Sequence, residues 1–322
     1  MRLRLVPQET NWDFFSRPTL WLGISGVLMV AALVSFFLQG LNFGIDFRGG
    51  TTIRTQSAQE VVVSDYRDAL VPLELGDVTI TEVFDPTFED DQNVTMIRIQ
   101  AQDGEEAVSS EMIEQVMAAL ATVAPDIDDV AVESVGPKVS GELIKTAVIA
   151  VVLAIGAVLV YIWLRFEWQF AVGAVLALVH DVVLTIGVFS ELQIRFDLAI
   201  IAALLTIVGY SLNDTVVVFD RVRENLRKFK KMDLKEVMNL SINETLSRTV
   251  MTSVTTLLAL VSLFVLGGDV IRGFVFAMIW GVIVGTYSSI FIASAVLLKL
   301  GVKRDWSKQA NTAGNQFADI DA

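Results

Sequence analysis

The stretch LAIIAALLTIVGYSLNDTVVVFDRVREN, from Leu198 to Asn225, is the most informative part of this sequence about its fold. Its apolar run is long enough to cross a bilayer as a helix, yet Asn213 and Asp214 interrupt it before it ends at Phe219. A carboxyl group inside a membrane helix costs several kcal/mol unless it is paired, hydrated or neutral. We therefore expect Asp214 to face a protein interior, where it either fastens two helices together or takes up and releases an ion.

Further apolar stretches of this length indicate a polytopic α-helical membrane protein. The 322 residues are 53% hydrophobic, and their mean hydropathy of +0.59 exceeds that of soluble globular proteins. The absence of cysteine excludes disulfides, thiolate metal sites and cysteine nucleophiles. We predict six transmembrane helices, at Leu20–Leu38, Leu143–Leu164, Phe170–Phe189, Leu198–Phe219, Thr249–Leu266 and Phe274–Leu298.

The positions of lysine and arginine predict the orientation of these helices. Basic residues gather in front of the first helix, between the fourth and fifth helices and in the tail, whereas the short loops on the other side hold only Arg195 and Arg272. The first helix is too long for a cleaved signal and is predicted to be an anchor. The expected order is cytoplasmic N-terminus 1–19, transmembrane helix 20–38, periplasmic domain 39–142, five transmembrane helices over 143–298 with a basic cytoplasmic loop at 220–248, and cytoplasmic tail 299–322.

Residues 39–142 are numerous enough to form a domain of their own. Their pattern changes between the period of two typical of strands and helical spacing, in the order strand, helix, strand, strand, helix, strand. This order is that of the ferredoxin-like α+β fold, which many unrelated proteins use. The predicted elements are Thr51–Gln56, Ala58–Leu73, Val78–Phe84, Val94–Gln100, Glu105–Val123 and Val130–Val135.

No pattern in this domain is typical of an active site. It holds no paired carboxylates in catalytic spacing, no nucleophile with a histidine partner and no metal-binding motif, so neither enzymatic activity nor a metal site is expected. Its acidic clusters, at residues 89–91, 103–106 and 126–129, are predicted to be solvated surface or a patch that faces a partner.

The motif FGIDFRGGT, Phe43 to Thr51, joins the first helix to the first strand. Gly44, Gly49 and Gly50 permit positive φ or close backbone approach, and Asp46 is able to hydrogen-bond a turn. The motif is therefore predicted to form a tight turn where the chain leaves the membrane. It is no phosphate-binding loop, because no helix beginning with Lys-Ser or Lys-Thr follows it.

Two more features in the membrane bear on ion handling. Asp181 and His180, the chain's only histidine, are neighbours in the third helix, where Asp181 is a second and weaker candidate for ion coupling. Arg248 stands at the start of the fifth helix, which runs antiparallel to the fourth, so a contact with Asp214 is geometrically allowed. Such a pair would keep the carboxylate ionised, and a proton would separate it.

Three motifs resemble the SecF family, subunits of the bacterial SecD–SecF complex of the Sec protein-export machinery. They are FGIDFRGG, VGYSLNDTVVVFDRVREN and SRTVMTSVTT, which begin at Phe43, Val208 and Ser247. The resemblance covers nearly the whole chain and implies membership of the resistance-nodulation-division superfamily, with a place in the bacterial inner membrane. Asp214 and Arg248 match the positions that contribute to the proton path in that family.

The resemblance implies a transport role driven by the proton-motive force. The expected partners are SecD, the SecYEG translocon, the accessory subunit YajC and unfolded preproteins. No nucleic-acid partner is expected, because the bias of basic residues toward the cytoplasm and an interfacial helix explain the basic loop. No cofactor is expected beyond the coupling ion, H⁺ or Na⁺, since a carboxyl beside Asn213 and several hydroxyls would serve either.

Two other functions stay open on the sequence alone. One is an efflux transporter of the same superfamily, of which this chain would be half a unit. The other is a passive scaffold that stabilises a translocon without using an ion gradient.

Overall fold

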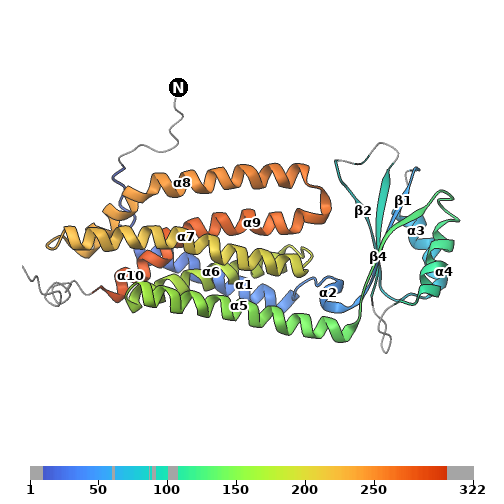
Figure 1. Ribbon diagram of the computed structural model, residues 1–322, viewed down its shortest axis with the longest axis horizontal. Coiled ribbons are helices and arrows are strands. Elements are labelled where there is room, and N and C mark those ends of the chain that lie inside the picture. The colour runs from blue at the N-terminus through green and yellow to red at the C-terminus, as the bar shows by residue number, and fades with distance from the viewer. Residues whose placement is uncertain (1–9, 60–61, 87, 89–91, 101–107, 303–322) are drawn as a thin grey trace, which may run out of the picture.

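A computed structural model describes residues 10–302 except for 60–61, 87, 89–91 and 101–107. The acidic clusters at 89–91 and 103–106, the first three residues of the helix predicted from Glu105, and the tail from residue 303 lie outside the described residues. Helices packed side by side form one end of the molecule, and a sheet with its own helices forms the other (Figure 1).

Within the described chain, six helical spans are long and apolar enough to cross a membrane, as predicted. The sixth of them is continuous through a short π-helical segment in the middle. The first five spans are α1 (Pro18–Gln39), α5 (Pro137–Arg165), α6 (Trp168–Glu191), α7 (Leu198–Lys228) and α8 (Leu234–Leu266). The sixth span consists of α9 (Gly268–Ser288), the π-helix η2 (Ser289–Ala293) and α10 (Ser294–Leu300).

The domain between α1 and α5 has the predicted ferredoxin-like topology. Its four strands are antiparallel, in the order β2-β3-β1-β4. Ile53, Ile97 and Leu120 are buried between the sheet and its two main helices, whereas the alternate residues of the strands face the membrane bundle. The elements are α2 (Ile45–Arg48), β1 (Gly50–Ser57), α3 (Val63–Leu70), η1 (Val71–Leu73), β2 (Val78–Val83), β3 (Asn93–Gln100), α4 (Ser110–Leu120) and β4 (Asp128–Val135).

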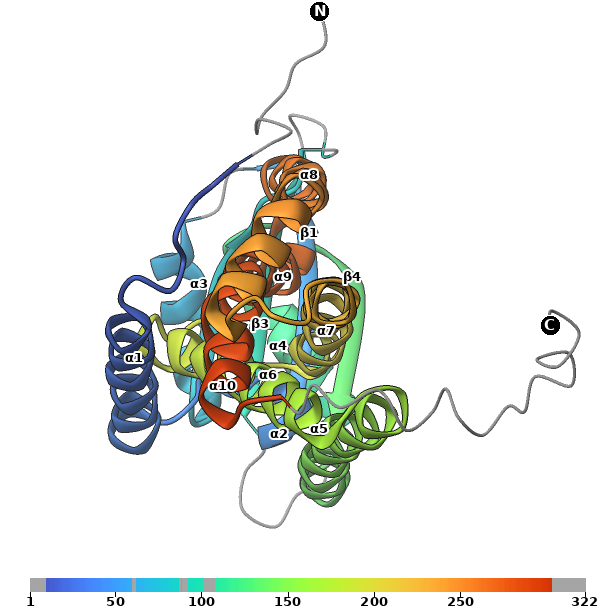
Figure 2. The same ribbon diagram turned by 90° about the vertical axis from the view of Figure 1, so that its left-hand side faces the viewer.

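The bundle is layered around α6, α7 and α9. Most of α6 and of the sixth span is buried inside the chain, whereas α1, α5 and α8 are mostly exposed and surround them (Figure 2). Small residues bring the helices close together: a Cβ atom on Gly187 of α6 would lie 2.2 Å from the Cβ atom of Ala32 on α1. The central helices are therefore the ones that have a protein interior in which to hold polar groups.

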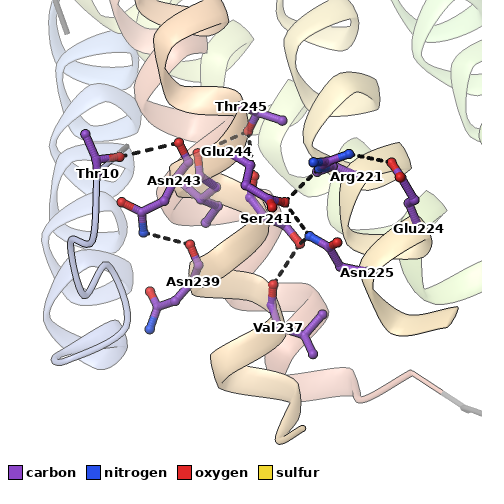
Figure 3. Close-up of polar contacts among 11 residues, drawn as sticks. Thr10, Arg221, Glu224, Asn225, Val237, Asn239, Ser241, Asn243, Glu244 and Thr245 are labelled. Atoms are coloured by element: carbon purple, nitrogen blue, oxygen red, sulfur yellow. Dashed lines mark hydrogen bonds and ion pairs between the residues drawn. The ribbon is translucent and has the colours of Figure 1, made fainter. Parts of the chain in front are cut away.

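The chain between residues 220 and 248, predicted as a basic loop, is helical over most of its length. The helix α7 continues to Lys228 and α8 begins at Leu234. At this end of the bundle Glu244 of α8 accepts hydrogen bonds from Arg221 and Asn225 of α7, at 2.7 Å and 2.6 Å (Figure 3). These hydrogen bonds satisfy polar side chains of α7 and α8 beyond the apolar parts of the two helices, where both helices continue.

Candidate functional site

The carboxyl of Asp214 lies in the interior of the bundle, 7% exposed. Its Oδ1 accepts a hydrogen bond from the hydroxyl of Thr249 on α8 at 2.8 Å, and its Oδ2 accepts one from Ser289 at 3.1 Å. Three helical spans therefore meet at this one group. A hydroxyl both donates and accepts hydrogen bonds, so the same surroundings satisfy either protonation state of the carboxyl.

Arg248 does not form the expected pair with Asp214. The ion pairs of the described residues include none between these two side chains, and Arg248 is exposed on the surface of the bundle. The reason is helical geometry: Thr249 faces the carboxyl, so its neighbour in sequence points about 100° away. Asn213, next to Asp214, is exposed for the same reason.

A second buried carboxyl, Asp181 of α6, lies among hydroxyl groups close to the first. Its Oδ2 accepts hydrogen bonds from Ser211 of α7 at 2.6 Å and from Ser288 of α9 at 2.8 Å. Its Oδ1 lies 3.0 Å from Nδ1 of His180, which is equally buried. Asp181 thus has hydrogen-bond partners on both oxygens, which offset the cost of its burial.

The two carboxyls accept hydrogen bonds from neighbouring serines at the start of the π-helix. Ser288 contacts Asp181, and Ser289, the next residue, contacts Asp214. On α7, Ser211, which donates to Asp181, is three residues before Asp214. Short π-helical segments inside α-helices occur frequently at functional sites, because they change the rotation of the residues that follow.

Sequence reasoning did not identify Ser288 and Ser289 as part of a site. Small residues occur at every fourth place of the sixth span, Ser289 among them, and this pattern favours close helix packing and does not indicate a site. The helices do pack closely here, since a Cβ atom on Gly285 would lie 3.1 Å from the Cβ atom of Ser211. A pair of adjacent serines in an otherwise apolar span was the signal available in the sequence.

The glycine motif lies at the outer end of α7. Its Asp46 accepts a hydrogen bond from the backbone N–H of Leu198 at 3.0 Å, on the helix that carries Asp214. Gly44 packs so closely against Arg195 that a Cβ atom would lie 2.9 Å from its Nε, and Gly49 and Gly50 have φ of 78° and 133°. The motif therefore turns the chain into β1 and contacts the bundle as it does so.

A polar cavity of about 690 Å³ separates the sheet from the outer ends of the helices. Both Arg98 of β3 and Arg195 line it, and burial, together with the nearby charge of Arg195, lowers the pKa of Arg98 to about 10. The domain contacts the bundle on either side of the cavity, at Asp46 and at Phe84, whose carbonyl accepts from the backbone N–H of Asp269 on α9 at 2.9 Å.

The described residues contain no group of three or more His, Cys, Asp or Glu side chains able to hold a metal ion. The chemistry that the buried groups support is transfer of a proton or a small cation among carboxyl, hydroxyl and imidazole groups. No nucleophile is paired with a base around a substrate cleft in that part of the chain.

Comparison with known proteins identifies two matching families. Residues 115–303 match the family described as the protein export membrane protein SecD/SecF, C-terminal, and residues 34–61 match the SecD/SecF GG motif. The protein translocase subunit SecF of Cereibacter sphaeroides is 61% identical over 100% of this chain and 99% of its own length. That of Rhodobacter capsulatus is 58% identical over 96% of this chain and 94% of its own length.

Solved structures show the same fold. A crystal structure of SecDF from Thermus thermophilus, titled a translocon-associated membrane protein, is 35% identical over 93% of this chain, with a TM-score of 0.80. A second SecDF structure, in a super-membrane-facing form, gives 36% identity and a TM-score of 0.65. This chain spans 40% of the length of each of those proteins.

Proposed function

The chain belongs to the SecF family of protein translocase subunits, and on this premise we propose that it couples an ion gradient to movement of its outer domain during protein export. The coupling ion is H⁺, and Asp214 is the group that binds and releases it. The role is mechanical and no covalent chemistry is required of the chain. One charge that crosses the membrane gains about 2.3 kcal/mol per 100 mV, enough for one or a few protons to drive a hinge.

The observation that carries this proposal is the position of Asp214 on a helix whose outer end contacts the glycine motif. Protonation turns one oxygen of Asp214 into a donor, so Thr249 or Ser289 accepts a hydrogen bond instead of donating one, and this rearrangement changes the packing of α7 against α8 and the sixth span. At the outer end of α7, the bond from Leu198 to Asp46 transmits the change to the turn before β1.

The second connection between the outer domain and the bundle, from β4 to α5, is a single residue long. β4 ends at Val135 and α5 begins at Pro137, with Gly136 alone between them. The hydroxyl of Ser140 on α5 is 3.5 Å from the carbonyl of Ile45 in α2, so the two connections also contact each other. Movement of the bundle would therefore tilt the domain as a unit.

The exposed positions of Arg248 and Asn213 favour a partner protein in the membrane. Both are exposed on the surface of this chain, Asn213 within the fourth span and Arg248 at the start of the apolar part of the fifth, and a polar side chain that faces lipid is costly. A partner that covers this surface of α7 and α8 removes that cost. We assign this partner as SecD, because the solved SecDF proteins are more than twice as long as this chain.

The remaining assignments follow from the family. The chain lies in the bacterial inner membrane with both termini in the cytoplasm, since the basic residues gather at the end of the bundle opposite the sheet. The SecD–SecF complex acts beside SecYEG and YajC, and its substrate is the unfolded preprotein that leaves the channel. The relatives are named translocase subunits, which favours export over efflux.

The test is export into inverted membrane vesicles under separately imposed proton and sodium gradients. We expect Asp214→Asn, in a SecD–SecF complex that still assembles, to lose the part of export that depends on the gradient. Asp220→Asn is the matched control, since it alters an exposed carboxyl of the same helix. Export by Asp214→Asn at the wild-type rate would refute the proposal, and would favour the passive scaffold. Dependence on sodium alone would replace H⁺ by Na⁺.

A further inference from the structure

Within the described residues, Nε2 of His180 is a buried polar atom of the membrane bundle without a hydrogen-bond partner. The side chain of His180 is 2% exposed, and the other ring nitrogen, Nδ1, lies 3.0 Å from Oδ1 of Asp181. We infer that His180, together with Asp181, is a second proton-binding site of this protein, in communication with Asp214. The inference rests on the proposed function, and extends it to a residue to which no role has been given above.

Hydrogen-bond geometry determines where the proton binds. Nδ1 of His180 lies 3.0 Å from Oδ1 of Asp181, and a carboxylate accepts, so Nδ1 carries the hydrogen in the neutral ring. Nε2 then has a free lone pair, and its burial without a donor is costly. A proton that binds at Nε2 produces an imidazolium beside a carboxylate. The net charge of the pair changes from −1 to zero, which the membrane interior favours.

The two sites are neighbours in the bundle. Asp181 accepts from Ser288 at 2.8 Å and Asp214 accepts from Ser289 at 3.1 Å, and these serines are adjacent in the chain. Charges interact strongly in a low-dielectric interior, so the charge on Asp214 influences whether a proton binds at His180.

Few other titratable groups surround His180. The ring of Tyr287 on α9 lies 6.1 Å from the imidazole, but its hydroxyl is engaged by Ser25 on α1 at 2.9 Å. Across the part of the chain that the structure describes, no hydrogen bond or ion pair joins α5 or α10 to His180 or Asp181. Asp181 on its own helix and Asp214 on α7 are thus the groups whose charge this imidazole experiences.

The test uses the fact that the chain has a single histidine. The full SecD–SecF complex, with this subunit alone labelled with ¹⁵N-histidine and purified without a histidine tag, gives one pair of imidazole signals. Their chemical shifts report directly which nitrogen carries a proton. We expect the Nδ1–H tautomer at high pH and protonation of Nε2 as the pH falls.

Coupling is tested in Asp214→Asn. Loss of that negative charge makes the imidazolium less favourable, so at a given pH a smaller fraction of His180 should be protonated in the variant than in the wild type. Ser262→Ala is the control, since that hydroxyl is exposed and bonds only to a carbonyl of its own helix. An imidazole that stays neutral over the whole pH range, or one that titrates identically in Asp214→Asn and the wild type, would overturn the inference.

The experiment is independent of export. A neutral His180 combined with gradient-dependent export that Asp214→Asn abolishes would remove the second site and leave the proposed function intact. Conversely, His180 could be protonated in a way that depends on Asp214 while the complex exports preprotein equally well without an ion gradient. That result would refute the proposed function, and His180 would remain only a buried proton acceptor.

Discussion

At the scale of single residues, the surroundings of Asp214 differ from those of a structural ion pair. Its two oxygens contact two hydroxyls and no guanidinium, so the group is satisfied with or without its proton. A buried ion pair would have favoured only the charged form. This is why the exposed position of Arg248 supports exchange of an ion, and why Arg248 is free to contact a partner chain.

Thr249 should be necessary for this balance. Thr249→Val removes the donor to Oδ1 of Asp214, and one hydrogen bond to a charged group is worth about 1.5 kcal/mol or more. We expect gradient-driven export to fall about tenfold. Thr252→Val is the control, because Thr252 bonds only to carbonyls of its own helix. Equal export by the two variants would contradict a role for the Thr249 hydroxyl.

Asp197 gives a second prediction, on pH dependence. Burial raises the pKa of this carboxyl, although Arg195 opposes the effect, and its side chain caps α7 through the N–H of Ile200 at 3.3 Å. A raised folded-state pKa means that the protonated form is favoured by folding. That contribution is full below the unfolded-state pKa near 3.8 and is lost as the pH rises through the folded-state pKa.

Asp197→Asn should therefore be less sensitive to pH than the wild type. Asparagine keeps a capping oxygen and has no proton to lose. Between about pH 4 and about pH 7, the Tm of the wild type in detergent should fall relative to that of the variant. A constant difference in Tm over this range would show that the carboxyl has the same pKa in the folded and unfolded states.

At the scale of elements, close contact between helices depends on missing side chains. The contact of α1 with α6 passes through Gly187, where a Cβ atom would meet the backbone of Ala32 at 2.7 Å. Backbone atoms cannot move aside as a flexible side chain does, so the two helices would have to separate. The missing side chains of Gly281 and Gly285 likewise let α9 approach α7 closely. This approach brings Ser288 and Ser289 within hydrogen-bond distance of Asp181 and Asp214.

Gly187→Ala should consequently destabilise the bundle by about 1–3 kcal/mol, the usual cost of overpacking. Gly156→Ala on α5 is the matched control, because no atom lies within 4 Å of the added Cβ and alanine favours a helix by up to about 1 kcal/mol. Thermal unfolding in detergent measures both. A Tm for Gly187→Ala at or above that of Gly156→Ala would contradict this account of the helix contact.

At the scale of the whole molecule, contacts between the outer domain and the bundle lie on either side of a cavity. On one side Asp46 accepts from the N–H of Leu198, and on the other Phe84 and Asp269 share a backbone hydrogen bond. These contacts connect the domain to α7, which carries Asp214, and to α9, whose Ser288 donates to Asp181. A tilt of the domain about the first contact would require the second to open.

A crosslink at the second contact should therefore stop the motion. The chain has no native cysteine, and the backbones of residues 84 and 269 are close enough for a disulfide in Phe84→Cys with Asp269→Cys. We expect oxidation to abolish gradient-driven export and reduction to restore it. Thr51→Cys with Ser134→Cys, a pair of strand neighbours, is the control that locks only the sheet. Full export by the oxidised 84–269 pair would refute motion at this contact.

The six spans, the order of the sheet elements and the inward direction of Asp214 were all predictable from the sequence. Each depends on a local property, either the length of an apolar run, a period of two or 3.6, or the cost of a carboxyl in lipid, and tertiary contacts do not alter these. The basic segment after Phe219 was less predictable, because polar residues end an apolar run without ending its helix, which continues to Lys228.

Which side chains contact one another was not predictable from the sequence and required the packed helices. The contacts of Asp214 with Thr249 and Ser289, of Asp181 with Ser288, and of Asp46 with Leu198 join residues far apart in the chain. Each residue turns a helix by about 100°, so the choice of Thr249 over Arg248 depends on a rotation smaller than one third of a turn. Hydropathy carries no information on that rotation, which is determined by how the small residues of α6 and α9 let the helices pack.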